Sequence, residues 1–131
     1  MLKFRTAREG IDVAGAFAPL QGHKYLSLAS FRKNGQAVHT PLWFAENAGK
    51  VYVMTRDDSW KFKRIRNNPC VRAAPSTMRG RIMGPEIEGR ARILPANEFA
   101  AARTLLQHKY SLMRIPFVWS NRNVFIEIVP I

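Results

Sequence analysis

The sequence predicts a mainly β protein, a closed six-stranded antiparallel barrel with short flanking helices. Three observations predict it. Apolar and polar residues alternate along several short segments, turn residues separate these segments, and only two stretches show a helical pattern. With 131 residues, the chain has the length of one domain, so we expect a single domain over residues 1–131.

Residues 24–32 (KYLSLASFR) and 37–45 (AVHTPLWFA) predict the first two strands. The Asn34-Gly35 pair between them favours a tight hairpin turn, because both residues tolerate a positive φ. Pro41 cannot donate a hydrogen bond to a neighbouring strand. We therefore expect the second strand to lie at an edge, or to be bulged, near Pro41.

The remaining strands are predicted by β-branched, aromatic and alternating segments at residues 51–55, 70–76, 85–94 and 123–131. The two helical stretches cover residues 59–67, which end before a proline, and residues 96–110, which are rich in alanine. Closing six strands into a barrel removes the sheet edges. Apolar residues on both faces of several strands favour a homodimer that packs barrel against barrel.

Charge and cysteine content narrow the function classes. The chain carries 21 Lys+Arg and 9 Asp+Glu, a formal charge of +12, which attracts phosphates, nucleic acid, acidic lipids or polyanionic small molecules. Cys70 is the single cysteine, so no disulfide or cysteine metal site is predicted, and we expect a buried, inert thiol. Residues 1–20 predict neither a signal peptide nor a membrane span. We therefore expect a cytoplasmic protein.

The segment TRDDSWKFKRIRNNP, residues 55–69, concentrates positive charge on one short helix. Ser59 lies at the start of this helix and Lys61 two positions later, an arrangement that suits a phosphate because backbone amides, a hydroxyl and an ammonium group meet there. The alternative is that Asp57, Asp58 or Ser59 caps the helix and that its cations form a solvated face. The residues alone leave both interpretations open.

Other polar and aromatic residues favour structural roles. Thr55 ends a strand and either points at the same spot as Ser59 or satisfies its own turn. The tryptophans fit a core or an interface as well as a stacked ligand; they are Trp43, Trp60 and Trp119. The histidines lack metal-ligand spacing, and Glu86 and Glu88 fit a cross-strand ion ladder. No nucleophile–base pair is evident, so a bound cofactor would carry any chemistry.

Three segments, YLSLASFRKNGQAVHTPLWF, VYVMTRDDSWKFKRIRNNPCVRAAP and EIEGRARIL, resemble the split β-barrel proteins of the pyridoxamine-phosphate-oxidase-like superfamily. The resemblance covers residues 24–94 and is closest to the branch described as F420-dependent oxidoreductases. It implies a six-stranded split barrel that forms a homodimer. It also implies that FMN or the deazaflavin F420 binds in a groove at the dimer interface.

The resemblance also implies the cofactor-binding residues. Those along the ring system are Thr40, Pro41, Leu42 and Trp43. Those at the phosphate-binding turn are Thr55, Ser59, Trp60 and Lys61, with Lys61 as the main charge. Those on the next strand toward the cofactor are Ala74, Pro75 and Ser76.

The chain departs from true pyridoxamine-phosphate oxidases, because it lacks their longer C-terminal section with a substrate-binding Arg and His. A haem-ligand histidine like that of the haem-degrading relatives cannot be placed either. Cations that would attract a polyglutamate tail favour F420 slightly over FMN; they are Arg56, Lys63, Arg64, Arg79 and Arg81.

The predicted reaction is hydride transfer between the cofactor and a small conjugated organic substrate. Two alternatives remain. One is a non-catalytic cofactor-binding protein, a carrier or a sensor. The other is a basic β-barrel that binds single-stranded nucleic acid through aromatic residues such as Phe31, Trp43 and Tyr52. Against it, the positive charge clusters on the helix and loops instead of interleaving with these aromatic residues, so nucleic acid is not the expected partner.

Overall fold

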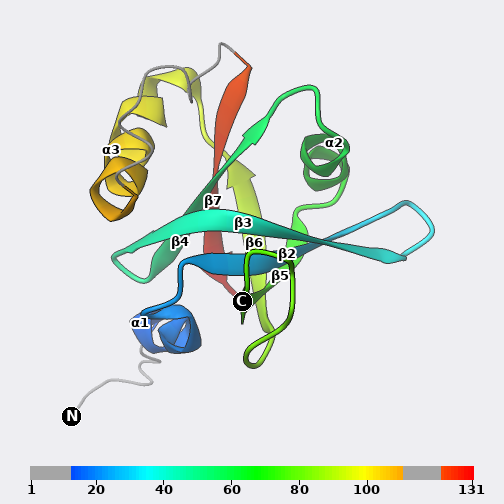
Figure 1. The fold of residues 1–131 in the computed structure, drawn as a ribbon. Helices are drawn as coiled ribbons and strands as arrows, with labels where there is room; N and C mark the ends of the chain where they lie inside the picture. Colours follow the sequence, from blue (N-terminus) through cyan, green and yellow to red (C-terminus); the bar gives the residue numbers. More distant parts are fainter. Residues whose placement is uncertain (1–12, 111–121) are drawn as a thin grey trace.

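The structure, a computed structural model, describes residues 13–110 and 122–131. All six predicted strands are present and close into an antiparallel barrel in the order β2-β3-β4-β7-β6-β5 (Figure 1). The strands are β2 (Tyr25–Phe31), β3 (Ala37–Asn47), β4 (Lys50–Arg56), β5 (Cys70–Ser76), β6 (Ile87–Ile93) and β7 (Asn123–Pro130). The α-helices are α1 (Val13–Ala16), α2 (Trp60–Asn67) and α3 (Phe99–Lys109), and the short 3-10 helices are η1 (Ala18–Leu20) and η2 (Ala96–Glu98).

Strand β3 changes its partner halfway along its length. Residues 37–43 pair with β2, and residues 44–47 pair with β4. Pro41 lies opposite Ser27 in the half that has β2 on one side and no paired strand on the other. The edge position predicted from Pro41 is therefore confirmed.

The turn between β2 and β3 differs from the predicted one. Gly35 has φ of 89° and donates its N–H to the carbonyl of Arg32 at 2.8 Å, whereas Asn34 does not have a positive φ. Asn34 instead accepts the amide of Gln36 through its side-chain oxygen at 2.9 Å. One left-handed residue therefore suffices, because the side chain of Asn34 stabilises the turn locally.

The barrel interior holds the main hydrophobic core, with inward residues from all six strands. Phe17 and Leu20, from the N-terminal segment, are also fully buried in this core. The sequence analysis did not predict α1 or η1, because elements of four and three residues carry no readable periodicity.

A second apolar cluster lies between α3 and the outer face of the barrel. Ala102, Leu106 and Tyr110 pack there against Ala45 and Phe125. Figure 1 shows α3 and α2 on opposite sides of the barrel. The helices predicted at residues 59–67 and 96–110 are confirmed as α2 and α3. Because they lie on opposite sides, each covers a different part of the outer face of the barrel.

The prediction of a buried thiol is wrong, because Cys70 is exposed. Cys70 is the first residue of β5, whose outward positions include Arg72 and whose inward positions include Val71 and Ala73. Alternation along the strand places Cys70 on the same outward face as Arg72.

Glu127 is a buried carboxylate on β7. Its oxygens accept hydrogen bonds from Arg92 at 3.2 Å and from the Tyr52 hydroxyl at 3.0 Å, and Lys50 lies 3.8 Å away. Burial alone would raise the pKa of Glu127, but the bonds from Arg92 and Tyr52 outweigh it and hold the pKa below its ordinary value. Glu127 thus stays charged in the folded barrel.

Because the folded-state pKa of Glu127 is lowered, its ionised form stabilises the barrel above the ordinary pKa of 4.5. This contribution should disappear as the pH falls through the lowered pKa. We expect the urea midpoint of Glu127→Gln to change less with acidification below 4.5 than that of the unmodified protein. Equal acid sensitivity of the two proteins would contradict this role.

Candidate functional site

The turn between β4 and α2 is closed by two hydroxyl groups. Ser59 is the N-cap of α2: its Oγ accepts the amide of Phe62 at 3.1 Å and donates to the carbonyl of Arg56 at 2.8 Å. Thr55 Oγ1 lies 3.1 Å from Ser59 Oγ and, since the Ser59 proton is already used, Thr55 is the donor. The capping alternative is thus present for Ser59, and its donation to a phosphate stays a prediction.

We expect Ser59→Ala to lower the free energy of unfolding by about 1 kcal/mol, the usual cost of losing an N-cap oxygen. Chemical denaturation followed by circular dichroism measures this loss. Ser59→Asn, which keeps a capping oxygen, should retain most of the stability. A loss of equal size in both variants would show that the cap is not the stabilising element.

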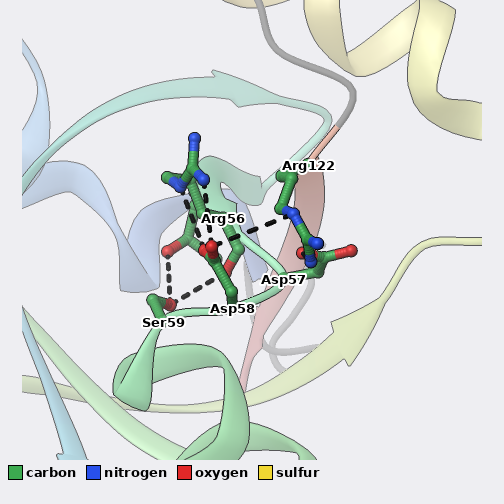
Figure 2. Close-up of polar contacts among 6 residues, drawn as sticks. Arg56, Asp57, Asp58, Ser59 and Arg122 are labelled. Atoms are coloured by element: carbon green, nitrogen blue, oxygen red, sulfur yellow. Dashed lines mark hydrogen bonds and ion pairs between the residues drawn. The ribbon is translucent and has the colours of Figure 1, made fainter.

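The acidic residues before Ser59 are each matched by an arginine (Figure 2). Asp58 accepts two hydrogen bonds from Arg56, at 3.0 Å and 2.9 Å, and Asp57 accepts one from Arg122 at 3.1 Å. The bond from Arg56 lowers the pKa of Asp58. Two uncompensated carboxylates would repel an anion at this turn, but the arginines compensate their charge.

Lys61 lies in the first turn of α2 and is half-buried. Burial, followed by repulsion from Arg64, lowers the pKa of its ammonium group. Within residues 13–110 and 122–131, no carboxylate lies within ion-pair distance of Lys61. The structure therefore holds a partly desolvated cation without a counter-charge next to the free amides of a helix start.

The unpaired half of β3 carries the residues that were predicted to lie along the ring system of the cofactor. Pro41, Leu42 and Trp43 line a cavity of about 260 Å³ together with Tyr25, Met54 and Leu106. Met54 precedes Thr55, so β4 connects this cavity to the turn before α2. Thr40 lies opposite Leu28 and is half-buried. The two predicted groups thus lie on adjoining elements.

Tyr110, at the end of α3, fixes the point where β3 changes partner. Its hydroxyl contacts the Lys24 carbonyl at 2.6 Å, the Phe44 carbonyl at 2.8 Å and the Phe44 amide at 3.0 Å. Its ring stacks on Trp43 at a centroid distance of 5.0 Å. The sequence analysis missed Tyr110, because no local pattern connects it with a strand 66 residues away.

Ala74, Pro75 and Ser76 are buried on β5, one strand away from the edge half of β3. Strand β2 separates the two groups, since Leu26 lies opposite both Leu42 and Pro75. The Ser76 hydroxyl donates to the carbonyl of Thr77 at 3.0 Å. These three residues therefore lie on the opposite side of β2 from the edge half of β3. Their direct contact with a ligand stays a prediction.

The remaining aromatic and titratable candidates are dispersed. Trp60 is 74 % exposed, Trp43 is half-buried, and Trp119 lies outside the described residues. Glu86, which directly precedes β6, lies 3.3 Å from Nε2 of His39 and forms an ion pair with Arg72 of β5 at 3.9 Å, as predicted for Glu86. Across the described part of the chain, no three His, Cys, Asp or Glu side chains are grouped so that they would hold a metal ion.

None of the helices in the described ranges is both long enough and apolar enough to cross a membrane.

Comparison with known proteins identifies the family. A profile of the pyridoxamine 5'-phosphate oxidase family matches residues 15–121, most of the chain. No curated protein matches this chain. Solved structures share the fold at low identity and do not show more than the fold.

Three of these structures illustrate the kinds of protein that share the fold. A FAD-binding protein from Mesorhizobium loti is 19% identical, with a TM-score of 0.67 over 92% of this chain and 91% of that one. A conserved hypothetical protein from Mycobacterium tuberculosis is 19% identical, with a TM-score of 0.68 over 97% and 81% of the two chains. The haem storage protein from Vibrio cholerae is 12% identical, with a TM-score of 0.69 over 98% and 92%. The match over residues 15–121, together with the six-stranded barrel, shows that the chain belongs to the pyridoxamine 5'-phosphate oxidase family.

Proposed function

We propose that this protein binds a flavin or a deazaflavin and works as an oxidoreductase on a small conjugated organic substrate. The observation that carries the proposal is Lys61, a half-buried cation without a carboxylate partner in the described part of the chain. Lys61 lies where the family resemblance implies that the cofactor phosphate binds. A phosphate there would supply the missing counter-charge.

The turn around Lys61 fits a phosphate. The backbone amides of Trp60 and Lys61 belong to the first turn of α2, where helix geometry leaves N–H groups without an intrahelical acceptor. Arg56 and Arg122 compensate the two neighbouring aspartates and so reduce their repulsion of an anion. Because Ser59 is engaged in capping, we assign the binding charge to Lys61 and the shape of the turn to Ser59 and Thr55.

The edge half of β3 fits a flat ring. The Phe44 amide and carbonyl point toward β2, where Tyr110 binds them beside Lys24. Backbone groups alternate in direction along a strand, so those of Pro41 and Trp43 face the side without a paired strand. The Pro41 carbonyl and the Trp43 amide are therefore available to orient a heterocycle from its edge.

A bound flavin or deazaflavin supplies the hydride chemistry. The residues of this chain orient and shield that group. Pro41, Leu42 and Trp43 provide an apolar wall that excludes water from one side. Lys61 provides positive charge that favours an anionic ligand, and we assign no residue to proton transfer.

We propose a homodimer for the same region. Three large apolar side chains in the loop after β5 are exposed, Met78 at 63 %, Met83 at 49 % and Ile82 at 44 %. This loop folds toward the edge half of β3, since a Cβ atom on Gly80 would lie 3.9 Å from Cδ of Pro41. A second copy seated there would cover the apolar side chains and enclose the ring site.

We favour F420 over FMN because α2 offers further cations beyond the phosphate position. Lys63 and Arg64 line a cavity beside α2. Arg56 belongs to the cations predicted to attract a polyglutamate tail, but in the structure it is paired with Asp58. The FAD-binding relative from Mesorhizobium loti supports a flavin, and the haem storage protein from Vibrio cholerae shows that the fold also occurs in a protein described as storing haem.

Titration of the purified protein with FMN and, separately, with F420 tests the proposal. We expect saturable changes in absorbance and fluorescence for one of the two ring systems. The pre-reduced complex should then be reoxidised by an added conjugated quinone without oxygen. Binding without reoxidation would favour a carrier or sensor, and the absence of saturable binding to either compound would overturn the cofactor assignment.

A further inference from the structure

A basic groove runs between α2 and the turn that joins β2 and β3. Two cavities of about 430 Å³ and 330 Å³ share four lining residues, Arg32, Lys33, Arg64 and Asn67. Trp60 and Lys63 line one end of this basic groove, and Phe31 and Asn68 line the other. It does not include Lys61 or the edge half of β3.

The charge of the basic groove is of one sign. Four cationic side chains line the two cavities, and among the lining residues there is no carboxylate. Arg64 is fixed in place, because its Nε donates to Ser30 Oγ at 2.8 Å. Burial, followed by repulsion from Arg32, lowers the pKa of Arg64. In the part of the chain that the structure describes, none of these four cations forms an ion pair with a carboxylate, which favours a ligand with several anionic groups.

Aromatic side chains stand at both ends of the basic groove. The Trp60 indole is 74 % exposed, and the Lys63 ammonium lies 4.5 Å from its ring centroid. Phe31 is half-buried, with the Arg72 guanidinium 5.4 Å from its ring centroid. A third cavity of about 330 Å³ shares Phe31 and Asn68 and is also lined by Arg72 and by one carboxylate, Glu88. Aromatic rings therefore flank the cations of the basic groove, and Glu88 is the acidic residue at the far end of the path.

We propose that the basic groove binds single-stranded nucleic acid, with phosphates along its cations and a base stacked on Trp60. A cationic path between aromatic platforms is the arrangement by which proteins hold single strands without reading their sequence. The length of the path, over three adjoining cavities, fits a strand better than one phosphate group.

The aromatic residues differ from those that the sequence suggested for this function. Trp43 and Tyr52 pack in the apolar cluster beneath α3, so they are not available to bases in the basic groove. Phe31 remains, and Trp60, which the sequence placed at the phosphate turn, takes the principal role. This proposal does not rest on the proposed redox function. Lys63 and Arg64 line the basic groove and are also the cations that we assigned beyond the phosphate position, so an F420 tail and a nucleic-acid strand would compete for them.

Fluorescence anisotropy with a labelled oligothymidylate of about 12 nucleotides tests the proposal. Four contacted phosphates predict that log K falls with log salt at a slope of about −3 between roughly 50 and 200 mM. Arg64→Gln and Lys63→Gln should each reduce this slope by about 0.7. Trp60→Ala should weaken binding roughly 5- to 150-fold.

Arg66→Gln is the matched control. Arg66 carries the same charge on the same helix, but it lies over the Phe62 ring and lines none of the three cavities. It should leave oligonucleotide affinity within about twofold of the unmodified protein. Thermal melts confirm that each variant is folded. Parallel titrations with FMN, whose proposed site does not include Lys63 or Arg64, show whether the redox site is intact in each variant.

Three results would overturn the proposal. One is the absence of binding at about 50 mM salt. Another is an Arg66→Gln variant as weak as Arg64→Gln, which would indicate attraction by net charge alone. The last is an unchanged affinity of Trp60→Ala combined with full displacement of the oligonucleotide by an equal concentration of inorganic pyrophosphate. That combination would indicate a site for small anions.

Discussion

Replacing Lys61 by alanine should weaken binding of the preferred cofactor, FMN or F420, by about 1.5–3 kcal/mol, the range for a hydrogen bond to a charged group. This corresponds to a roughly 10- to 150-fold higher Kd. The effect should be large for a lysine, because Lys61 is half-buried and has no carboxylate partner among the described residues. Cofactor fluorescence in a direct titration measures it.

Arg66→Ala is the control for Lys61→Ala. It removes one positive charge from the same helix but at an exposed position over Phe62. We expect its affinity for the cofactor to stay near that of the unmodified protein, since exposed charges are largely screened. An affinity for FMN and F420 that is unchanged in Lys61→Ala would remove Lys61 from the site and leave the cationic helix without a phosphate role.

Tyr110→Phe should lower the free energy of unfolding by about 1–3 kcal/mol. The hydroxyl accepts the Phe44 amide and directs its one proton toward the Lys24 and Phe44 carbonyls, at the point where β3 leaves β2. Phenylalanine keeps the ring that stacks on Trp43 but leaves these buried backbone groups without a partner. Urea denaturation at neutral pH measures the loss.

Tyr25→Phe is the matched comparison, because Tyr25 makes no hydroxyl hydrogen bond among the described residues and lines the cavity beside β3. It should change the denaturation midpoint little. If Tyr110→Phe were as stable as Tyr25→Phe, the hydroxyl would not be what holds the two halves of β3 in place. Cofactor titration of both variants then shows whether the geometry of β3 matters for binding.

The strands could be predicted because their information is local. Side chains alternate with a period of two, so residues 24–32 and 85–94 are recognisable as strands without knowledge of their partners. The edge position near Pro41 could also be predicted from that residue alone, since the missing N–H of a proline restricts any strand that contains it. The partner change at Phe44 was not predictable, because it depends on Tyr110, 66 residues later.

The same distinction applies to the candidate site. Ser59 and Lys61 were found because a helix start is a local feature. The compensation of Asp57 depends on Arg122, 65 residues away, so no local pattern could show that the repulsion of an anion at this turn is reduced. The assignment of Trp60 to the phosphate turn stays a prediction for its backbone amide, while its exposed ring lies at one end of the basic groove. That geometry arises only when α2 packs beside the β2–β3 turn.

The missing N–H of Pro41 has a consequence for aggregation. An unpaired strand edge is a template on which another extended chain can add and propagate. In β3 the unpaired half points the nitrogen of Pro41 outward, because the Phe44 amide, three residues later, points toward β2. An incoming strand would therefore meet a ring and no donor in the middle of this half. The half of β3 that lacks a second neighbour is thus a poor seed for fibril growth.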